Sequence, residues 1–331
     1  MTHSIRLIDP CAPRDYADEA DLAGLGGTEA TVLRVVSGLG RQVPIIVEQA
    51  ARQMPTRRGP LAFVPMDLAK RSDDLTIVIN SWKVALTVAK RNPNARVCVW
   101  QHVVPGRHNR VMADDLVAAG ITLLCVSDSL RKTLAQMLQA AVKMQVIYNP
   151  ISDDLHPEAT PRDPDLLIFA SAPHKGLDQV LRAFVTLRQT IPALRLELAD
   201  PGYLSWPVGD LPAGVSHLGV LQHAQVVARM RKALCLFYPQ QRFAETFGLV
   251  IAEANAVGTP ALLHRGLGAN DEVASDASQC IDGSDPSQIA DRVHAWRAHR
   301  PLVRVNPAFR LSQVLSTWQT LLIPAPVPAF S

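Results

Sequence analysis

Residues 97–126, VCVWQHVVPGRHNRVMADDLVAAGITLLCV, begin and end on a short apolar run with a segment of mixed polar and apolar residues between them. Runs of this kind are typical of strands that are buried on both faces of a parallel sheet. Similar runs recur through the first half of the chain, at 5–8, 75–79, 97–100, 122–126 and 146–148. Residues 29–39 carry apolar side chains at helical spacing, with Val32, Leu33, Val36 and Leu39 on one face. Strands and helices therefore alternate, which predicts an α/β sheet.

A polar, proline-rich stretch at 152–165, SDDLHPEATPRDPD, interrupts this alternation and is typical of a linker. The pattern then restarts, with strand-like runs at 166–169, 194–198 and 233–238 and a helical pattern at 177–189. We therefore predict two Rossmann-like α/β domains, at 1–150 and 151–310. A last helix at about 311–322 and a proline-containing tail make up residues 311–331, which we expect to pack back on the first domain.

Composition limits the classes of function. The 331 residues hold 33 basic and 30 acidic side chains, a net charge of +3, and the basic residues are scattered, so nucleic acid is not the expected partner. The five cysteines include no C-x-x-C pair, which argues against a disulfide framework and a cysteine zinc site. The N-terminus lacks the pattern of a signal peptide, and no apolar run is long enough to span a membrane. We expect a cytoplasmic protein, at most in peripheral contact with the inner face of the membrane.

Three segments carry the chemistry of a candidate site. The first is the glycine-rich loop at 24–29, GLGGTE, at the start of a helix, where the backbone N–H groups of Gly26 and Gly27 could bind a phosphate. Glu29 occupies the place of the third glycine of a dinucleotide-binding motif, so that motif is not matched. A simple glycine turn capped by Thr28 is the alternative.

The second segment is the loop at 171–177, SAPHKGL, between a predicted strand and a predicted helix. Ligands of open α/β sheets bind beyond the carboxyl ends of the strands, which places Lys175 where a diphosphate needs a cation. A solvated surface lysine is the alternative.

The third segment is 245–260, ETFGLVIAEANAVGTP, which predicts a helix from about residue 247 to Gly258, with Pro260 beyond its end. Glu245 lies in the loop before this helix and Glu253 nearly two turns inside it. Helical side chains lean towards the N-terminus, so both carboxylates can reach one ligand at that end.

These residues resemble the E-x7-E signature of the family 4 retaining glycosyltransferases, which have the GT-B fold of two Rossmann-like domains facing each other across a cleft. The order of motifs is also similar over nearly the whole chain: the glycine-rich loop, Asn149-Pro150 at the domain junction, Lys175-Gly176, and Glu245 to Glu253. The segment 215–219, VSHLG, is similar to the one that cradles the nucleotide base.

The resemblance implies a role for each residue. Lys175 and the N–H groups at 247–249 would stabilise the leaving phosphate, Glu245 would hold the donor sugar and Glu253 the ribose, and His102 would bond a sugar hydroxyl. The full set of implied site residues comprises His102, Lys175 and Glu245 as catalytic groups and Gly26, Gly27, Lys175, Leu218, Gly219, Glu245, Thr246, Phe247, Gly248, Leu249 and Glu253 as donor-binding groups.

One departure from the family stands out. Relatives carry an arginine five residues before the lysine, where this chain has Ala170. Arg242, another cation or backbone N–H groups could substitute for it, or the enzyme could be less active than its relatives.

Two other segments are weak candidates for a metal-binding or membrane-binding site. Asp163-Pro164-Asp165 has the D-x-D pattern of metal-binding glycosyltransferases but lies in the predicted linker. Arg52, Arg57 and Arg58 form a weak basic cluster for an anionic membrane, for which a solvated loop is the alternative.

The implied function is transfer of a hexose from a UDP- or GDP-sugar to a saccharide or lipid-linked saccharide acceptor, in lipopolysaccharide or exopolysaccharide synthesis. The implied mechanism retains the anomeric configuration and needs no metal or other cofactor. A sugar-nucleotide epimerase or hydrolase of the same fold and a catalytically inactive sugar-nucleotide-binding protein are the alternatives.

Overall fold

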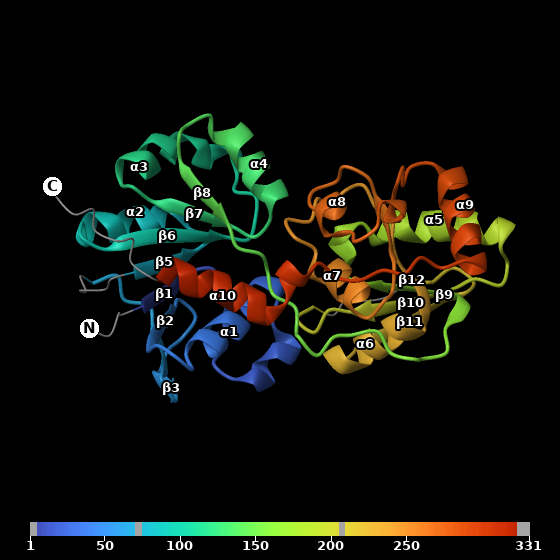
Figure 1. The fold of residues 1–331 in the computed structure, drawn as a ribbon, viewed down its shortest axis with the longest axis horizontal. Helices are drawn as coiled ribbons and strands as arrows, with labels where there is room; N and C mark the ends of the chain where they lie inside the picture. Colours follow the sequence, from blue (N-terminus) through green and yellow to red (C-terminus); the bar gives the residue numbers. More distant parts are fainter. Residues whose placement is uncertain (1–4, 70–74, 205–208, 323–331) are drawn as a thin grey trace.

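The computed structural model describes residues 5–69, 75–204 and 209–322 of the chain. They form two α/β units, one built on an eight-stranded and one on a six-stranded sheet, side by side along the long axis of the molecule (Figure 1). All strand pairs are parallel except β3 with β4. The predicted two-domain α/β architecture with parallel sheets is confirmed. The proline-containing tail predicted beyond residue 322 lies outside the described residues.

The first sheet has the order β3-β4-β2-β1-β5-β6-β7-β8. Its strands are β1 Ile5–Asp9, β2 Ile45–Gln49, β3 Thr56–Arg58, β4 Leu61–Pro65, β5 Leu75–Ile79, β6 Arg96–Gln101, β7 Thr122–Cys125 and β8 Lys143–Val146. Its helices are α1 Gly27–Leu39, α2 Trp82–Arg91, α3 Ala113–Ala118 and α4 Asp128–Leu138. From β1 to β2 the strand order runs towards one edge of the sheet, and from β5 to β8 it runs towards the other edge. Because crossovers between parallel strands are right-handed, α1 lies on one face of the sheet and α2, α3 and α4 lie on the other.

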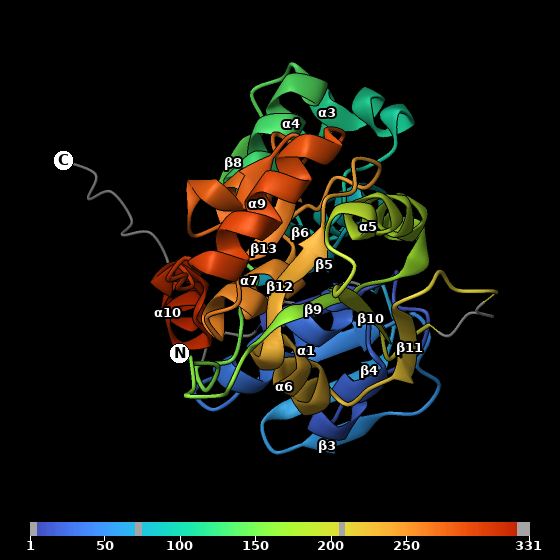
Figure 2. The same ribbon diagram turned by 90° about the vertical axis from the view of Figure 1, so that its right-hand side faces the viewer.

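The second sheet has the order β11-β10-β9-β12-β13-β14. Its strands are β9 Asp163–Ala170, β10 Arg195–Asp200, β11 Val215–Val220, β12 Ala233–Tyr238, β13 Ala261–His264 and β14 Cys280–Ile281. Its helices are α5 Leu177–Thr190, α6 His223–Lys232, α7 Leu249–Ala256, α8 Asn270–Val273 and α9 Pro286–Ala298. Seen from this end of the molecule, α5 and α9 cover one face of the sheet and α6 the other (Figure 2).

The last helix, α10 Leu311–Leu322, lies against α1 of the first unit (Figure 1). The Trp318 ring packs edge-on against Trp100 of β6, with 4.6 Å between the centroids, and Gln319 Nε2 donates to Gln42 Oε1 at 2.9 Å. The chain thus crosses between the units twice. The domain limits at 150 and 310 stay a prediction, although the sheets themselves divide between Val146 and Asp163. No helix in the described ranges is both long and apolar enough to span a bilayer.

Three sequence predictions are wrong in detail. The strand expected at 146–148 is β8, Lys143–Val146, because an edge strand is partly exposed and lacks a continuous apolar run. Asp163 and Asp165 lie in β9 rather than in a linker, and they pair with Arg195 and Arg297. Proline is typical of linkers, but it is also tolerated at the start of a strand, which is where Pro164 lies in β9.

Arg52 is also not part of a surface cluster. It is buried, bonded through Nε to Gln49 Oε1 at 2.7 Å and through Nη2 to the Tyr16 carbonyl at 3.1 Å, and stacked over the Phe63 ring. Arg57 and Arg58 are exposed on β3. Arg52 therefore supports the fold and cannot face a membrane.

Candidate active site

A cavity of about 810 Å³ is lined by residues of both halves of the chain. The first half contributes the start of α1 and the end of β6, and the second half contributes the loops after β9, β10 and β12. β9 and β12 are neighbours from which the chain leaves in opposite directions along the sheet. Open α/β sheets bind ligands at such a point, and the volume suits a small-molecule ligand.

Most of the predicted site residues line this cavity, namely Gly27, His102, Lys175, Glu245, Thr246, Phe247, Gly248, Leu249 and Glu253. Gly26, Leu218 and Gly219 do not line it. Gly26 is the N-cap of α1, and the other two lie within β11, whereas Leu221 and Gln222, just beyond that strand, face the cavity.

Two helix N-termini meet in the cavity wall. Gly248, with φ of 90°, is the N-cap of α7, so the helix begins at Leu249, two residues later than predicted. A Cβ on Gly27 would lie 3.3 Å from Leu249 Cδ1, which shows how closely α1 approaches α7. Thr28 is the second residue of α1 and Gly26 is the N-cap, contrary to the alternative of a Thr28-capped turn. Helix N-termini carry unpaired N–H groups and partial positive charge, so this corner favours an anion.

Lys175 and Glu245 form an ion pair beside this corner. The ammonium contacts the two carboxylate oxygens at 2.9 and 3.1 Å and lies 4.6 Å from the centroid of the Phe243 ring. Tyr238 Oη donates to Glu245 Oε1 at 3.0 Å. Burial and the Glu245 charge raise the pKa of Tyr238, so its hydroxyl stays a proton donor. The carboxylate is therefore held in one orientation.

His102 and Asn149 present polar atoms without partners. His102 is 4% exposed, and neither ring nitrogen is hydrogen-bonded within the described part of the chain. Burial lowers the pKa of His102 to about 3, so the imidazole is neutral near pH 7. Asn149 is buried in the cavity wall, and its Oδ1 has no partner among the described residues. Buried polar atoms of this kind are costly unless a ligand bonds them, which favours uncharged hydroxyl groups as their partners.

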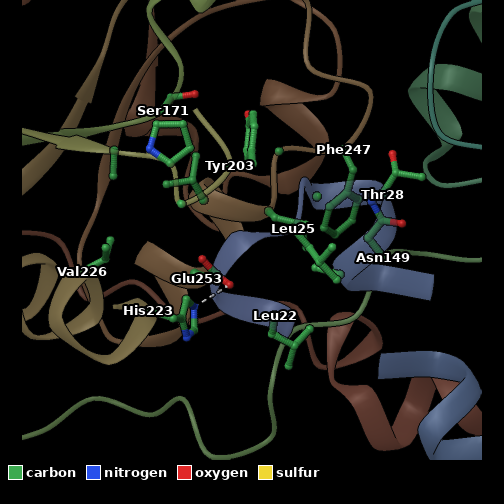
Figure 3. Close-up of a pocket in the computed structure, with 18 of the residues that line it drawn as sticks. Leu22, Leu25, Thr28, Asn149, Ser171, Tyr203, His223, Val226, Phe247 and Glu253 are labelled. Atoms are coloured by element: carbon green, nitrogen blue, oxygen red, sulfur yellow. Dashed lines mark hydrogen bonds and ion pairs between the residues drawn. The ribbon is translucent and has the colours of Figure 1, made fainter. Parts of the chain in front are cut away.

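Glu253 pairs with a residue that the sequence interpretation missed. Its Oε1 lies 3.0 Å from His223 Nε2, as the dashed line in Figure 3 shows. The hydrogen bond and the charge of Glu253 raise the pKa of His223. Burial alone would raise the pKa of Glu253, but the bond from His223 and the charges of His223 and Arg34 hold it below its ordinary value. Glu253 is therefore an oriented carboxylate anion.

Hydrogen bonds tie the two units together beside the cavity. Ser127 Oγ donates to the Thr246 carbonyl at 2.5 Å, and Thr246 Oγ1 donates to the His102 carbonyl at 2.6 Å. The Glu272 carboxylate accepts from the first two N–H groups of α4 at 2.8 and 2.7 Å. The loop that carries Glu245 is thus held directly against the first unit.

Of the substitutes considered for the arginine missing at Ala170, Arg242 does not reach the cavity. Arg242 is exposed and pairs with Asp178 at 3.0 Å, outside the cavity lining. Arg34 of α1 does line the cavity. No sequence signal marks Arg34 or His223, because the pattern of one helix does not tell which polar residue faces another domain. The sequence marks Asn149 only as part of the motif at the domain junction. Within the described ranges, no three His, Cys, Asp or Glu side chains form a metal-binding group.

Comparisons with known proteins agree with this architecture. Residues 156–304 match the family model of glycosyl transferases group 1. The D-inositol 3-phosphate glycosyltransferase of Thermobifida fusca (strain YX) is 31% identical over 176 residues, which are 46% of this chain and 40% of that protein. The match thus spans less than half the length of that curated relative.

Solved structures extend the likeness of fold to nearly the whole chain. The sucrose-phosphate synthase of Thermosynechococcus elongatus is 14% identical, with a TM-score of 0.72 over 96% of this chain and 98% of that one. AviGT4, a glycosyltransferase involved in avilamycin A biosynthesis, is 14% identical, with a TM-score of 0.63 over 97% of both chains. The predicted GT-B fold is therefore confirmed.

Proposed function

We propose that this protein is a retaining glycosyltransferase of family 4 that moves a hexose from a nucleotide-diphosphate sugar to a hydroxyl acceptor. The observation that carries the proposal is the oriented Lys175–Glu245 pair at the α7 N-terminus, in one cavity with the neutral, unpartnered imidazole of His102 from the other unit. A cation for phosphate and polar groups for sugar hydroxyls thus share one site.

In this proposal the donor lies along the second unit. Glu253 accepts hydrogen bonds from the ribose diol, and the N–H groups at the starts of α7 and α1 face the diphosphate. Glu245, His102 and Asn149 bond the sugar hydroxyls. The base lies beyond the end of β11, near Leu221 and Gln222, rather than at Leu218 and Gly219.

The reacting step separates the sugar from the diphosphate. Lys175 and the helix N-termini stabilise the negative charge that develops on the leaving oxygen, and they supply charge that a metal would otherwise provide. His102, with a pKa of about 3, is too weak a base to take the acceptor proton. We therefore assign that proton to the departing phosphate oxygen on the same face of the sugar, consistent with retention.

The acceptor is proposed as a saccharide or lipid-linked saccharide in lipopolysaccharide or exopolysaccharide synthesis, used in the cytoplasm or at the inner face of the membrane. Because one similar protein is named for inositol 3-phosphate, phosphorylated polyols belong in any acceptor panel.

The proposal is tested by incubating the protein with UDP- and GDP-hexoses, with and without acceptors, in excess EDTA. Transfer with retained configuration by NMR, abolished in Glu245→Gln, is the expected result. Free sugar or an epimerised donor without acceptor would instead indicate the hydrolase or epimerase alternative. Nucleotide binding without turnover would indicate the inactive binding protein, and loss of activity in EDTA that manganese restores would contradict the metal independence.

A further inference from the structure

Arg34 is a cation in the cavity wall that the proposed chemistry has not used. It is the eighth residue of α1 and half-buried, while Val32, Leu33, Val35 and Val36 around it are buried in the first unit. No hydrogen bond or ion pair to the guanidinium is found among the described residues. Arginine stays charged and offers five N–H donors in a planar fork that matches phosphate.

The other cations near the cavity already have carboxylate partners. Lys175 is matched by Glu245, and Arg242 by Asp178 outside the cavity. Ala170, which lines the cavity, provides no charge. Arg34 and Lys175 are the arginine and lysine among the described residues that line the cavity, and of these two only Lys175 forms an ion pair with a carboxylate.

Arg34 also acts on the pair at the ribose end of the proposed donor site. Its charge helps to hold the pKa of Glu253 below its ordinary value and opposes the rise in the pKa of His223, so both groups respond to the guanidinium. The Glu253 carboxylate is already bonded to His223 at 3.0 Å. The corner thus holds one anion, one permanent cation and a histidine whose protonation Glu253 favours. When His223 is protonated, an additional anionic group would balance its charge.

We propose that Arg34 binds a phosphate of the nucleotide donor from the opposite unit, beside the ribose that Glu253 holds. This inference rests on the proposed function and adds to it a second phosphate-binding cation supplied by the first unit. A phosphate on the acceptor shares the same chemistry. The neighbourhood of Glu253 and His223 favours the donor, because these residues belong to the second unit. Donor binding would then tie α1 to α6 and α7 across the cavity.

The test separates phosphate binding from an indirect effect on Glu253. The affinities of uridine, UMP and UDP, and of the guanosine series, are measured by calorimetry for the wild type and Arg34→Gln. A charge-assisted bond worth about 1.5–3 kcal/mol predicts a loss of about 10- to 150-fold for the phosphorylated ligands. Binding of the nucleoside should change less than threefold, about 0.6 kcal/mol. Arg34→Lys, which keeps the charge without the fork, should restore part of the loss.

Arg242→Gln is the matched control, because that arginine is exposed and paired outside the cavity, and it should leave all affinities unchanged. Equal losses for nucleoside and diphosphate would overturn the proposal, since Arg34 would then act through Glu253. Unchanged UDP and GDP affinity would also overturn it, and a KM raised only for phosphorylated acceptors would assign Arg34 to the acceptor instead. Wild-type protein that binds no nucleotide at all would refute the proposed function itself.

Discussion

Replacing Lys175 with methionine should destabilise the protein as well as inactivate it. The ammonium contacts both oxygens of Glu245, whose side chain is 8% exposed, and within the described residues Tyr238 is the other side chain bonded to that carboxylate. Methionine fills a similar volume but leaves the buried carboxylate without a cation. The substitution therefore removes one partner of a nearly buried ion pair.

The magnitude follows from burial. Breaking a fully buried pair costs about 3–5 kcal/mol. The Lys175 side chain is 21% exposed, so water reaches the pair and reduces the penalty to about 2–3 kcal/mol. At about 2–4 °C per kcal/mol for a domain of this size, the melting temperature should fall by about 4–12 °C.

A double variant distinguishes the unpaired charge from a loss of packing. Glu245→Gln in the Lys175→Met background removes the orphaned charge and keeps an oxygen for the Tyr238 hydroxyl, so at least half of the lost stability should return, without activity. Differential scanning calorimetry and urea unfolding of the wild type, both single variants and the double variant measure the coupling.

Lys132→Met is a matched control, because Lys132 is 68% exposed and pairs with Asp128 at 2.8 Å. A surface pair of this kind contributes at most about 1 kcal/mol. The reasoning would be refuted if Lys175→Met were as stable as Lys132→Met, or if the double variant were no more stable than Lys175→Met.

Three further predictions concern the cavity and the contact between the units. Between pH 6.5 and about 3 the unfolded chain binds a proton at His102 and the folded protein does not, so the free energy of unfolding falls as the pH falls, by up to about 1.4 kcal/mol per pH unit. Urea unfolding of His102→Gln at pH 7 and pH 5 should show a smaller loss than the wild type, and equal losses would contradict the burial argument. Glu272→Gln removes the negative charge that caps α4 and should weaken the contact between the two units by about 0.5–2 kcal/mol. The radius of gyration in X-ray scattering and the KM should then change, and if both stayed the same the prediction would be wrong. A Cβ on Gly202 would overlap the Ala23 carbonyl oxygen of the first unit, so Gly202→Ala should lower kcat/KM at least about tenfold, whereas Gly209→Ala, with open space around it, should leave kcat/KM unchanged.

The positions of many strands and of helices α1, α5 and α10 were predictable because they depend on local patterns, whereas strands β2, β4 and β13 were not predicted. The run at 75–79 and the helical pattern at 311–322 match β5 and α10 residue for residue. The apolar pattern did not predict the bounds of the edge strand β8, which is only partly buried. It also did not predict the burial of Arg52, because arginine is usually exposed. The exposure of β8 and the burial of Arg52 both depend on residues that are distant in the sequence.

The sequence by itself determined the alternation of strands and helices, the loop before α7 and the spacing of Glu245 and Glu253, since these are properties of consecutive residues. Only the tertiary structure decided that Lys175 meets Glu245, 70 positions away, and that His223 meets Glu253. The same holds for Arg34 and Asn149, which line the cavity beside them. The physical reason is that a helix or strand sets the direction of its own side chains, whereas packing of the two sheets and their helices decides which of those directions converge on one cavity.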